Sequence, residues 1–321
     1  MQVPALSVIV PTYNRASRLR RALEALRAQD AVPHDVEVVV VANNCTDDTR
    51  GVVTELQARG GVAIRYVEEP RQGNAHARNT GIAHARAPIL AFTDDDVVVT
   101  PGWARTIIDT FAAHPEVGFI GGPVLPEWSG APPAWLTREN WAPIAAVDYG
   151  DRALEVSVDH QVCLLTANFA LRRAVLARSG PFAPELQRVK DGIGSLEDRE
   201  LIARLCHAGV RGRYEPVLIA STWIEPARQT RRYHRRWHRG HGRFFAIMRD
   251  PEFERSRATV LGAPLHVYRT LLSSTATWLV AACRGCATIA ATAESQAWFS
   301  LGFLLQRAVG KPSRPARIAQ P

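Results

Sequence analysis

The sequence predicts an α/β fold, a mostly parallel sheet with helices on both faces. One observation is that apolar runs typical of buried strands alternate with amphipathic helical patterns over the first hundred residues. Another is that a polar cluster follows several of those strands. The composition, 46% hydrophobic and 22% charged over 321 residues, is that of a chain with a packed core and excludes extended disorder.

The β-branched runs and the helical periodicity give the order of elements. Strands are predicted at residues 6–10, 36–41, 64–67 and 88–92, and Pro11 ends the first of them. Helices are predicted between them at residues 17–29, 46–59 and 73–85. Because each strand is followed by a helix, the strands are expected to run parallel.

Three polar clusters lie at the carboxyl ends of predicted strands, at residues 12–15, 43–48 and 94–96. In open α/β sheets, ligands bind in the crevice outside the carboxyl ends of the strands. The positions of these clusters therefore predict a ligand site at one edge of the sheet.

The second half of the chain is less regular. Residues 121–150 are rich in Gly, Pro and Trp and predict a long loop region, and residues 160–171 suggest strands near a site. Residues 197–209 predict a helix closed by Gly209. Residues 256–310 predict helices that are apolar on one side, followed by a loose tail.

The acidic triplet Asp94, Asp95 and Asp96 follows a hydrophobic strand. Three adjacent carboxylates repel one another unless a cation or hydrogen-bond donors compensate. Mg²⁺ and Mn²⁺ prefer oxygen ligands and commonly keep phosphate in their coordination shell. The triplet therefore favours a divalent metal bound with a phosphorylated ligand, and a solvated acidic turn is the alternative.

Two further clusters bear on chemistry. Glu197 and Asp198 begin a predicted helix, where a carboxylate can act as a general base or simply offset the helix dipole. Residues 228–243 contain seven arginines and three histidines. This segment is suited to clamping a diphosphate, to binding nucleic acid or anionic lipid, or to forming a basic surface helix.

The net charge of +8 favours an anionic partner. The five cysteines do not form a disulfide pattern, and Cys283 and Cys286 are interpreted as parts of a packed helix. No apolar stretch reaches the length of a membrane span, and the first residues do not resemble a signal peptide. A cytoplasmic protein is expected, with peripheral contact to an anionic membrane surface left open.

An ordered set of motifs resembles the inverting, bacterial-type family 2 glycosyltransferases of the GT-A fold. The segments are SVIVPTYNRASRLRRALEAL, VEVVVVANNCTDDT, GNAHARNTGIAHARAPILAFTDDD, and TANFALRRAVLARSGPFAPEL followed by SLEDREL. They occur in the family's order over about residues 5–245. The third contains the counterpart of the metal-binding DxD motif, and the last contains that of the ED motif.

The resemblance implies roles for individual residues. Asp94 and Asp96 would bind Mg²⁺ or Mn²⁺, and Asp198, with Glu197 beside it, would be the catalytic base. Substrate contacts would come from Pro11, Thr12, Asn14 and Arg15 at the nucleotide, Asn43 and Asn44 at the base, Arg78 and Asn79 near the diphosphate and sugar, Asp94 and Asp95 in the triplet, and Asn168 in the acceptor segment.

Many members of the family have a histidine after the last core strand, where this chain has Trp223. His234 or His241 is the expected substitute. The resemblance also implies a glycosyltransferase domain over residues 1–245, with a nucleotide-sugar half at about 1–120 and an acceptor half at about 121–245. A helical extension with a loose tail would follow at 246–321.

The implied activity is transfer of a sugar from a nucleotide-diphosphate sugar to the hydroxyl of a carbohydrate, lipid-linked or small-molecule acceptor. Two alternatives stay open. One is a metal-dependent nucleotidyltransferase, and the other is a basic membrane- or nucleic-acid-binding module without catalysis. The acidic sheet edge argues against nucleic acid, because phosphates would be repelled there without a metal ion.

Overall fold

The computed structural model describes residues 3–30, 35–187, 196–249, 253–254 and 258–309. The chain forms two compact units. Unit 1 comprises Met1–Glu127, Val147–Lys190 and Glu197–Trp223, and unit 2 comprises Trp128–Ala146, Asp191–Leu196 and Ile224–Pro321.

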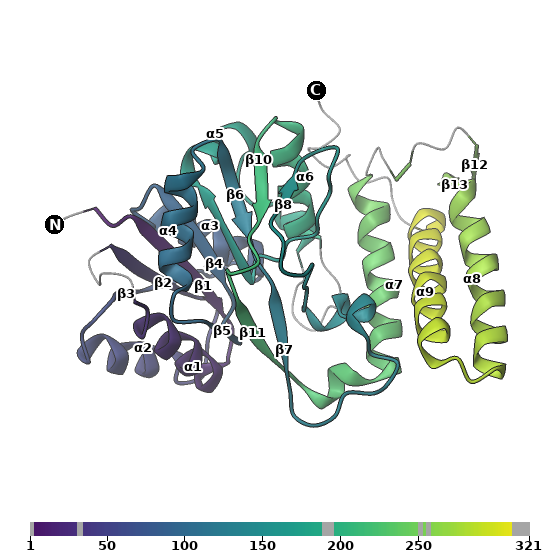
Figure 1. Cartoon of the computed structure of the whole chain (residues 1–321), viewed down its shortest axis with the longest axis horizontal. Helices are drawn as coiled ribbons and strands as arrows, with labels where there is room; N and C mark the ends of the chain where they lie inside the picture. Colours follow the sequence, from purple (N-terminus) through teal and green to yellow (C-terminus); the bar gives the residue numbers. More distant parts are fainter. Residues whose placement is uncertain (1–2, 31–34, 188–195, 250–252, 255–257, 310–321) are drawn as a thin grey trace. The chain divides into compact units, whose positions relative to one another are not determined.

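Most of unit 1 is built on an eight-stranded sheet with the order β3-β2-β1-β4-β9-β6-β10-β8 (Figure 1). The elements of the first half are β1 (Leu6–Thr12), α1 (Ala16–Arg27), β2 (Val36–Ala42), α2 (Thr49–Ala58), β3 (Ala63–Glu68), α3 (Asn74–His84), β4 (Ile89–Thr93), β5 (Val97–Val99), α4 (Trp103–Ala113) and β6 (Val117–Gly121). Those that follow are β7 (Val124–Trp128), β8 (Leu154–Val156), β9 (Asn168–Arg172), α5 (Leu176–Ser179), α6 (Glu197–His207), β10 (Arg211–Tyr214) and β11 (Ala220–Ile224).

The predicted α/β fold with a mostly parallel sheet is confirmed. β1 pairs in parallel with β2 along its whole length, from Leu6 opposite Val36 to Thr12 opposite Ala42, and β4 lies parallel on its other side. Two strands are exceptions: β9 runs antiparallel to both β4 and β6, and β8 runs antiparallel to β10 at the edge of the sheet. The carboxyl ends of β1, β2 and β4 therefore lie at the same edge of the sheet, as predicted from the positions of the three polar clusters.

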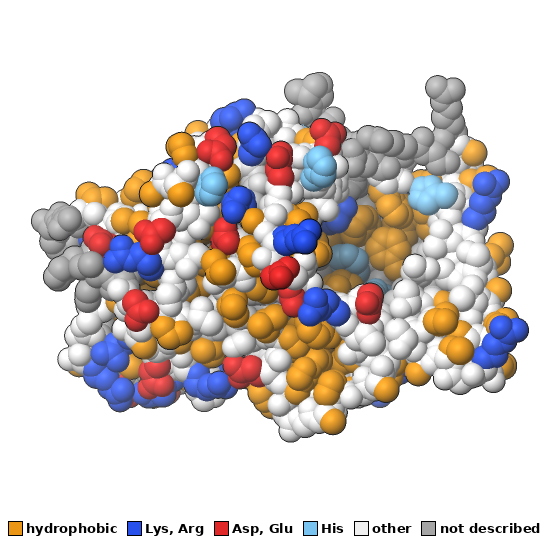
Figure 2. Space-filling model, viewed as in Figure 1, with side chains coloured by type: hydrophobic (Ala, Val, Ile, Leu, Met, Phe, Trp, Pro, Cys, Tyr) orange, Lys and Arg blue, Asp and Glu red, His pale blue; other side chains and the backbone are white. Residues whose placement is uncertain are grey.

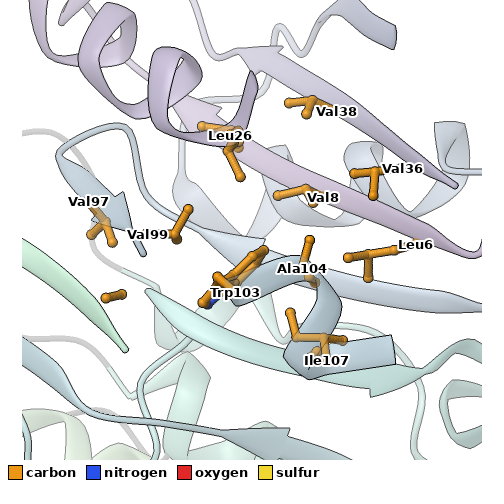
Figure 3. Close-up of a cluster of buried hydrophobic side chains, with 14 of the residues drawn as sticks. Leu6, Val8, Leu26, Val36, Val38, Val97, Val99, Trp103, Ala104 and Ile107 are labelled. Atoms are coloured by element: carbon orange, nitrogen blue, oxygen red, sulfur yellow. The ribbon is translucent and has the colours of Figure 1, made fainter. Parts of the chain in front are cut away.

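Successive residues of the central strands point to opposite faces, and both faces are buried. Val8 and Val38 pack against α1 and α4, with the fully buried Trp103 at the centre (Figure 3). On the other face, Ile9 and Phe92 pack with residues of α3 and α6. Helices thus cover both faces, which explains the continuous apolar runs of the strands.

Several predictions for the second half were wrong in detail. The region 121–150 contains strand β7 as well as loops, and within the segment 160–171 the strand begins only at Asn168. Residues expected to be helical form a small antiparallel pair, β12 (Thr259–Val260) with β13 (Ala263–Pro264). Helix α4 was not anticipated, whereas α6 was, and Gly209 beyond it has φ 71°.

Unit 2 contains three long helices, α7 (Arg231–Met248), α8 (Leu265–Cys283) and α9 (Ala287–Val309). Helix α9 packs against both of the others and lies between them (Figure 1). The packed-helix interpretation of the cysteine pair was wrong, because Cys283 ends α8, Cys286 lies in the following turn, and both are exposed. The turn also contains Gly285 at φ 70°.

Short 3-10 helices complete the fold. They are η1 (Arg138–Asn140), η2 (Ala142–Ile144), η3 (Arg173–Val175), η4 (Pro184–Leu186) and η5 (Pro226–Gln229). Helix α7 groups with the C-terminal helices, so the two compact units divide the chain differently from the predicted boundary at residue 245. The functional division at that boundary stays a prediction, and the predicted tail lies outside the described residues.

Candidate active site at the carboxyl edge of the sheet

The buried member of the acidic triplet is Asp95, which is 5% exposed. Its carboxylate accepts a hydrogen bond from Thr12 Oγ1 at 2.8 Å and pairs with an Arg15 guanidinium nitrogen at 3.1 Å. Burial, followed by the neighbouring charge of Asp96, raises the pKa of Asp95 to about 6, against the opposing effects of Arg15 and Thr12. The side chains that end β1 therefore anchor the turn after β4.

The other two carboxylates of the triplet also pair with arginines. Asp96 lies 3.0 Å from Arg15 and 3.7 Å from Arg18, whose guanidinium stands 5.6 Å from the centre of the Trp223 ring. Asp94 lies 3.1 Å from a guanidinium nitrogen of a third arginine, Arg78. The repulsion expected within the triplet is thus offset by three cations from α1, its preceding turn and α3.

Arg78 connects the triplet to the beginning of α6. Its buried guanidinium contacts Asp94 at 3.1 Å, Asp198 at 2.9 Å and Glu197 at 3.5 Å. Burial alone would lower the pKa of Arg78, but Asp198, Asp94 and Glu197 raise it above the ordinary value. The Phe182 ring, 5.4 Å from the guanidinium, completes its surroundings. One cation therefore holds together carboxylates that are about a hundred residues apart.

Asp198 is the more accessible carboxylate at the start of α6. Its side chain is 26% exposed, whereas that of Glu197 is 5% exposed. Thr166 donates to it twice, through its backbone nitrogen at 3.1 Å and its hydroxyl at 2.7 Å. These donors and Arg78 hold the carboxylate of Asp198 in one orientation.

The triplet offers suitable donors for a hard divalent ion. Asp94 and Asp96 supply oxygen ligands, and Mg²⁺ is often held by one or two carboxylates with substrate phosphate and water completing its shell. Among the described residues, no group of three or more His, Cys, Asp or Glu side chains is arranged to hold a metal. Asp94 and Asp96 could hold such an ion together with a phosphorylated ligand, and the ion would compete with the arginines for these carboxylates.

The expected histidine substitutes have partners within unit 2. His234 is 3% exposed and lies edge-on to Trp135, and burial lowers its pKa to about 4. His241 stacks on Trp237 with ring centres 4.3 Å apart. Substitution for the family histidine by either residue stays a prediction.

Several of the predicted substrate-binding asparagines support the framework. Asn168 is fully buried, accepts from Trp103 Nε1 at 2.7 Å and donates to two backbone carbonyls. Asn79 exchanges two hydrogen bonds with the backbone of Phe182. Asn43 is 4% exposed and bonds to the backbone of residues 69–73. The protein itself occupies these amides, and their role as substrate contacts stays a prediction.

Two predicted residues shape the neighbouring turns. Asn14, at φ 52°, accepts from the backbone nitrogen of Thr46 at 2.7 Å and so joins the turns after β1 and β2. Asn44, at φ 61°, donates to the backbone carbonyl of Pro70. Asn44 is exposed, as a residue facing a ligand has to be, and Pro11 is the penultimate residue of β1.

Sequence reasoning missed two residues of this cluster. Arg18 lies one helical turn after Arg15 on α1, and that spacing could have indicated a second cation facing the triplet. Thr166 precedes β9 and contacts Asp198 only because the chain folds back between them. No local pattern in the sequence signals the second contact.

The sheet order, the acidic turn after β4 and the carboxylates of α6 define an α/β protein of the GT-A type. The sequence model described as "Glycosyl transferase family 2" matches residues 7–178, more than half of the chain. The chain belongs to glycosyl transferase family 2.

Relatives and solved structures agree with this assignment. Validoxylamine A glucosyltransferase of Streptomyces hygroscopicus subsp. limoneus is 43% identical over 114 residues, which are 35% of this chain and 24% of that protein. Pre-mycofactocin glycosyltransferase of Mycobacterium tuberculosis is 29% identical over 219 residues, 67% of this chain and 42% of that protein. The chain thus matches about a quarter to two fifths of the length of these curated relatives.

Among solved structures, the mannosyltransferase PcManGT from Pyrobaculum calidifontis, in complex with GDP-Man and Mn²⁺, superposes with a TM-score of 0.62. It is 21% identical, and the match covers 96% of this chain and 88% of that one. S. aureus TarS with UDP has a TM-score of 0.54 at 17% identity, over 94% and 91% of the two chains. At these identities the likeness establishes the fold.

Proposed function

We propose that the chain is an inverting glycosyltransferase that moves a sugar from a nucleoside diphosphate sugar to an acceptor hydroxyl. The observation that carries this proposal is the position of Arg78 between Asp94 and Asp198. Arg78 thus contacts both Asp94, which is proposed to help bind the sugar donor, and Asp198, which is proposed to deprotonate the acceptor. A donor bound at the triplet would therefore have its reacting carbon near the base.

In the proposed reaction, Asp198 takes the proton of the acceptor hydroxyl. The hydroxyl oxygen forms a bond to the anomeric carbon while the bond from that carbon to the diphosphate oxygen breaks, with both electrons leaving on the nucleoside diphosphate. A single displacement of this kind inverts the anomeric centre. Thr166 and Arg78 hold the carboxylate in place, which accounts for their contacts in the structure.

We further propose that the reaction depends on Mg²⁺ or Mn²⁺, held by Asp94 and Asp96 together with the donor phosphates. When bound, the ion would neutralise charge on the leaving diphosphate. Arg15 and Arg18, which now pair with Asp96, would be available to phosphate oxygens. Thr12 and Asp95 would keep the turn in place, and Asn44 would face the base.

The donor is proposed to be a nucleotide-diphosphate sugar, because the solved neighbours contain UDP or GDP-Man. The acceptor is proposed to be a carbohydrate, a lipid-linked sugar or a small molecule in glycoconjugate biosynthesis. Relatives are described as acting on validoxylamine A and on an undecaprenol-linked oligosaccharide. We also propose that the protein works in the cytoplasm at an anionic membrane surface. Nucleic acid is not a proposed partner.

Two measurements on the full chain test the proposal. A thermal-shift screen of UDP-, GDP- and dTDP-sugars with Mn²⁺ should show stabilisation by a donor, about 2.7 kcal/mol at 100-fold over Kd. Product analysis should then find a nucleoside diphosphate. Release of pyrophosphate would instead identify a nucleotidyltransferase, and the absence of both donor binding and turnover would leave a non-catalytic module.

Substitutions assign the roles. Asp198→Asn should abolish transfer yet leave the donor-induced thermal shift, because only the acceptor proton loses its base. Asp96→Ala should remove metal-dependent turnover. The matched control is Asp159→Asn, an exposed carboxylate outside the cluster. Near-normal transfer by Asp198→Asn would show that another group is the base.

A further inference from the structure

Helix α8 exposes three of its larger apolar side chains. Its fully buried side is made of Val267, Ser274 and Ala281. Leu272, Leu279 and Val280 are 73%, 57% and 52% exposed. The helix is therefore only partly covered by its neighbours in unit 2.

These exposed residues form one continuous strip. Residues 272, 276, 279, 280 and 283 recur at the spacing of a single helical face, and all five are apolar and exposed. The strip lies opposite the buried side of α8, since residues 274 and 281 fall about half a turn away from it. We name this set, Leu272, Ala276, Leu279, Val280 and Cys283, the α8 strip.

The charges around the strip have one sign. Helix α8 contains no Asp or Glu, and the exposed Arg269 and Arg284 stand near its two ends. In Figure 2 the right-hand edge, over α8, shows hydrophobic side chains interspersed with Lys or Arg. Unit 2 as a whole has 17 Arg and Lys against 7 Asp and Glu, whereas unit 1 has 22 against 24. The positive charge of the protein is thus concentrated in the unit that presents the strip.

A surface that is apolar along its centre and basic at its ends matches the interface of an anionic bilayer. Transfer of leucine and valine side chains out of water is favourable. Each arginine near an anionic membrane surface strengthens the binding free energy by about 1 kcal/mol. No helix among the described residues is long and apolar enough to cross a membrane. An exposed apolar strip along one side of a helix, with arginines near both helix ends, can contact a bilayer with the helix lying in the plane of the interface.

A second copy of the chain is a poorer occupant of the strip. Two α8 helices packed antiparallel through the strip would place Arg269 of one copy near Arg284 of the other. Neither helix offers a carboxylate to compensate. Glu294 on α9 is 3% exposed and already pairs with Arg231 and Arg235, so it does not supply one.

We propose that the α8 strip docks the protein onto an anionic membrane surface, with Leu272 and Leu279 inserted among the acyl chains and Arg269 and Arg284 at the lipid phosphates. This inference rests on the proposed function, because it assigns the α8 strip to the membrane surface proposed there. The residues of the strip belong to unit 2, whereas Asp94, Asp96 and Asp198 belong to unit 1.

Vesicle co-sedimentation of the full chain tests the proposal. Vesicles of phosphatidylcholine with about a third phosphatidylglycerol should bind the protein, and binding should weaken as salt rises. Leu272→Asn/Leu279→Asn should lower the partition coefficient about 100-fold, at roughly tenfold for each leucine. Circular dichroism should show unchanged helix content and melting.

The control pair is Thr277→Asn/Thr292→Asn, which alters exposed residues of α8 and α9 outside the strip and should leave binding unchanged. Equal vesicle binding by the leucine variant and the wild type would overturn the proposal. So would a dimer, seen by light scattering without lipid, that the leucine variant abolishes, because the strip would then be an interface between copies. The donor-induced thermal shift, measured on the same samples, reports separately on the transferase site.

Discussion

Replacement of Asp95 by asparagine should change how the stability of the protein depends on pH. Burial and the charge of Asp96 raise the pKa of Asp95 to about 6 in the folded state, while an unfolded aspartate titrates near 3.9. Between these values the folded protein binds more protons than the unfolded chain. The free energy of unfolding therefore falls as pH rises through this window.

The difference between a folded pKa of about 6 and the unfolded value corresponds to a cost of about 3 kcal/mol once the carboxylate is ionised in both states, above pH 6. Asparagine can still accept the hydrogen bond from Thr12 and has no charge to bury. The stability of Asp95→Asn relative to wild type should thus rise by about 1 kcal/mol between pH 5 and pH 8, since part of the cost has already developed at pH 5.

Urea unfolding followed by circular dichroism, at several pH values in EDTA and without donor, measures this difference. Asp151→Asn is the matched control, because that carboxylate is exposed. A difference between Asp95→Asn and wild type that is constant with pH, or that falls as pH rises, would refute the reasoning from burial.

Three further substitutions test other parts of the structure. Thr166→Val should slow transfer about 10- to 100-fold with donor binding unchanged, because it removes one charge-assisted hydrogen bond to the base; Thr166→Ser should restore the rate in the same assay, and an unimpaired valine variant would contradict this role. Asn168→Ala should lower the free energy of urea unfolding by about 3 kcal/mol, since three buried partners lose their hydrogen bonds; a loss below about 1 kcal/mol would contradict that account. Gly302→Ala on α9 should lower the free energy of unfolding, measured with heat or urea, by about 1–3 kcal/mol, because a Cβ there overlaps the backbone carbonyl of Arg239 on α7. Gly130→Ala, which has open space around it, is the control. Equal stabilities of the two variants would show that α7 and α9 can move apart to accept the methyl group.

The first half of the fold was predictable because its elements are local and strongly patterned. β1 was expected over residues 6–10 and is Leu6–Thr12, and α1 was expected over 17–29 and is Ala16–Arg27. The antiparallel placement of β9 between β4 and β6 was not predicted. It depends on pairing between distant segments, and the apolar run of β9 is equally compatible with a parallel strand.

The acidic triplet and the Glu197–Asp198 pair were both singled out from the sequence, because closely spaced carboxylates after a strand or at a helix start are recognisable locally. The sequence did not show that one arginine connects them. Arg78 lies within a helix of small residues, and its partners Asp94 and Asp198 are 16 and 120 positions away. Likewise, the sequence did not show that the amides of Asn43, Asn79 and Asn168 hydrogen-bond within the protein.

The sequence by itself determined the alternation of strands and helices, the edge at which polar residues gather, and the membership of a family through an ordered set of motifs. These depend on periodicity and local chemistry, which are written along the chain. Only the tertiary structure decided that Arg78 lies between Asp94 and Asp198, that Asp198 is more exposed than Glu197, and that α8 leaves Leu272 and Leu279 uncovered. Burial and ion pairing depend on which distant segments pack together, and linear spacing does not specify that.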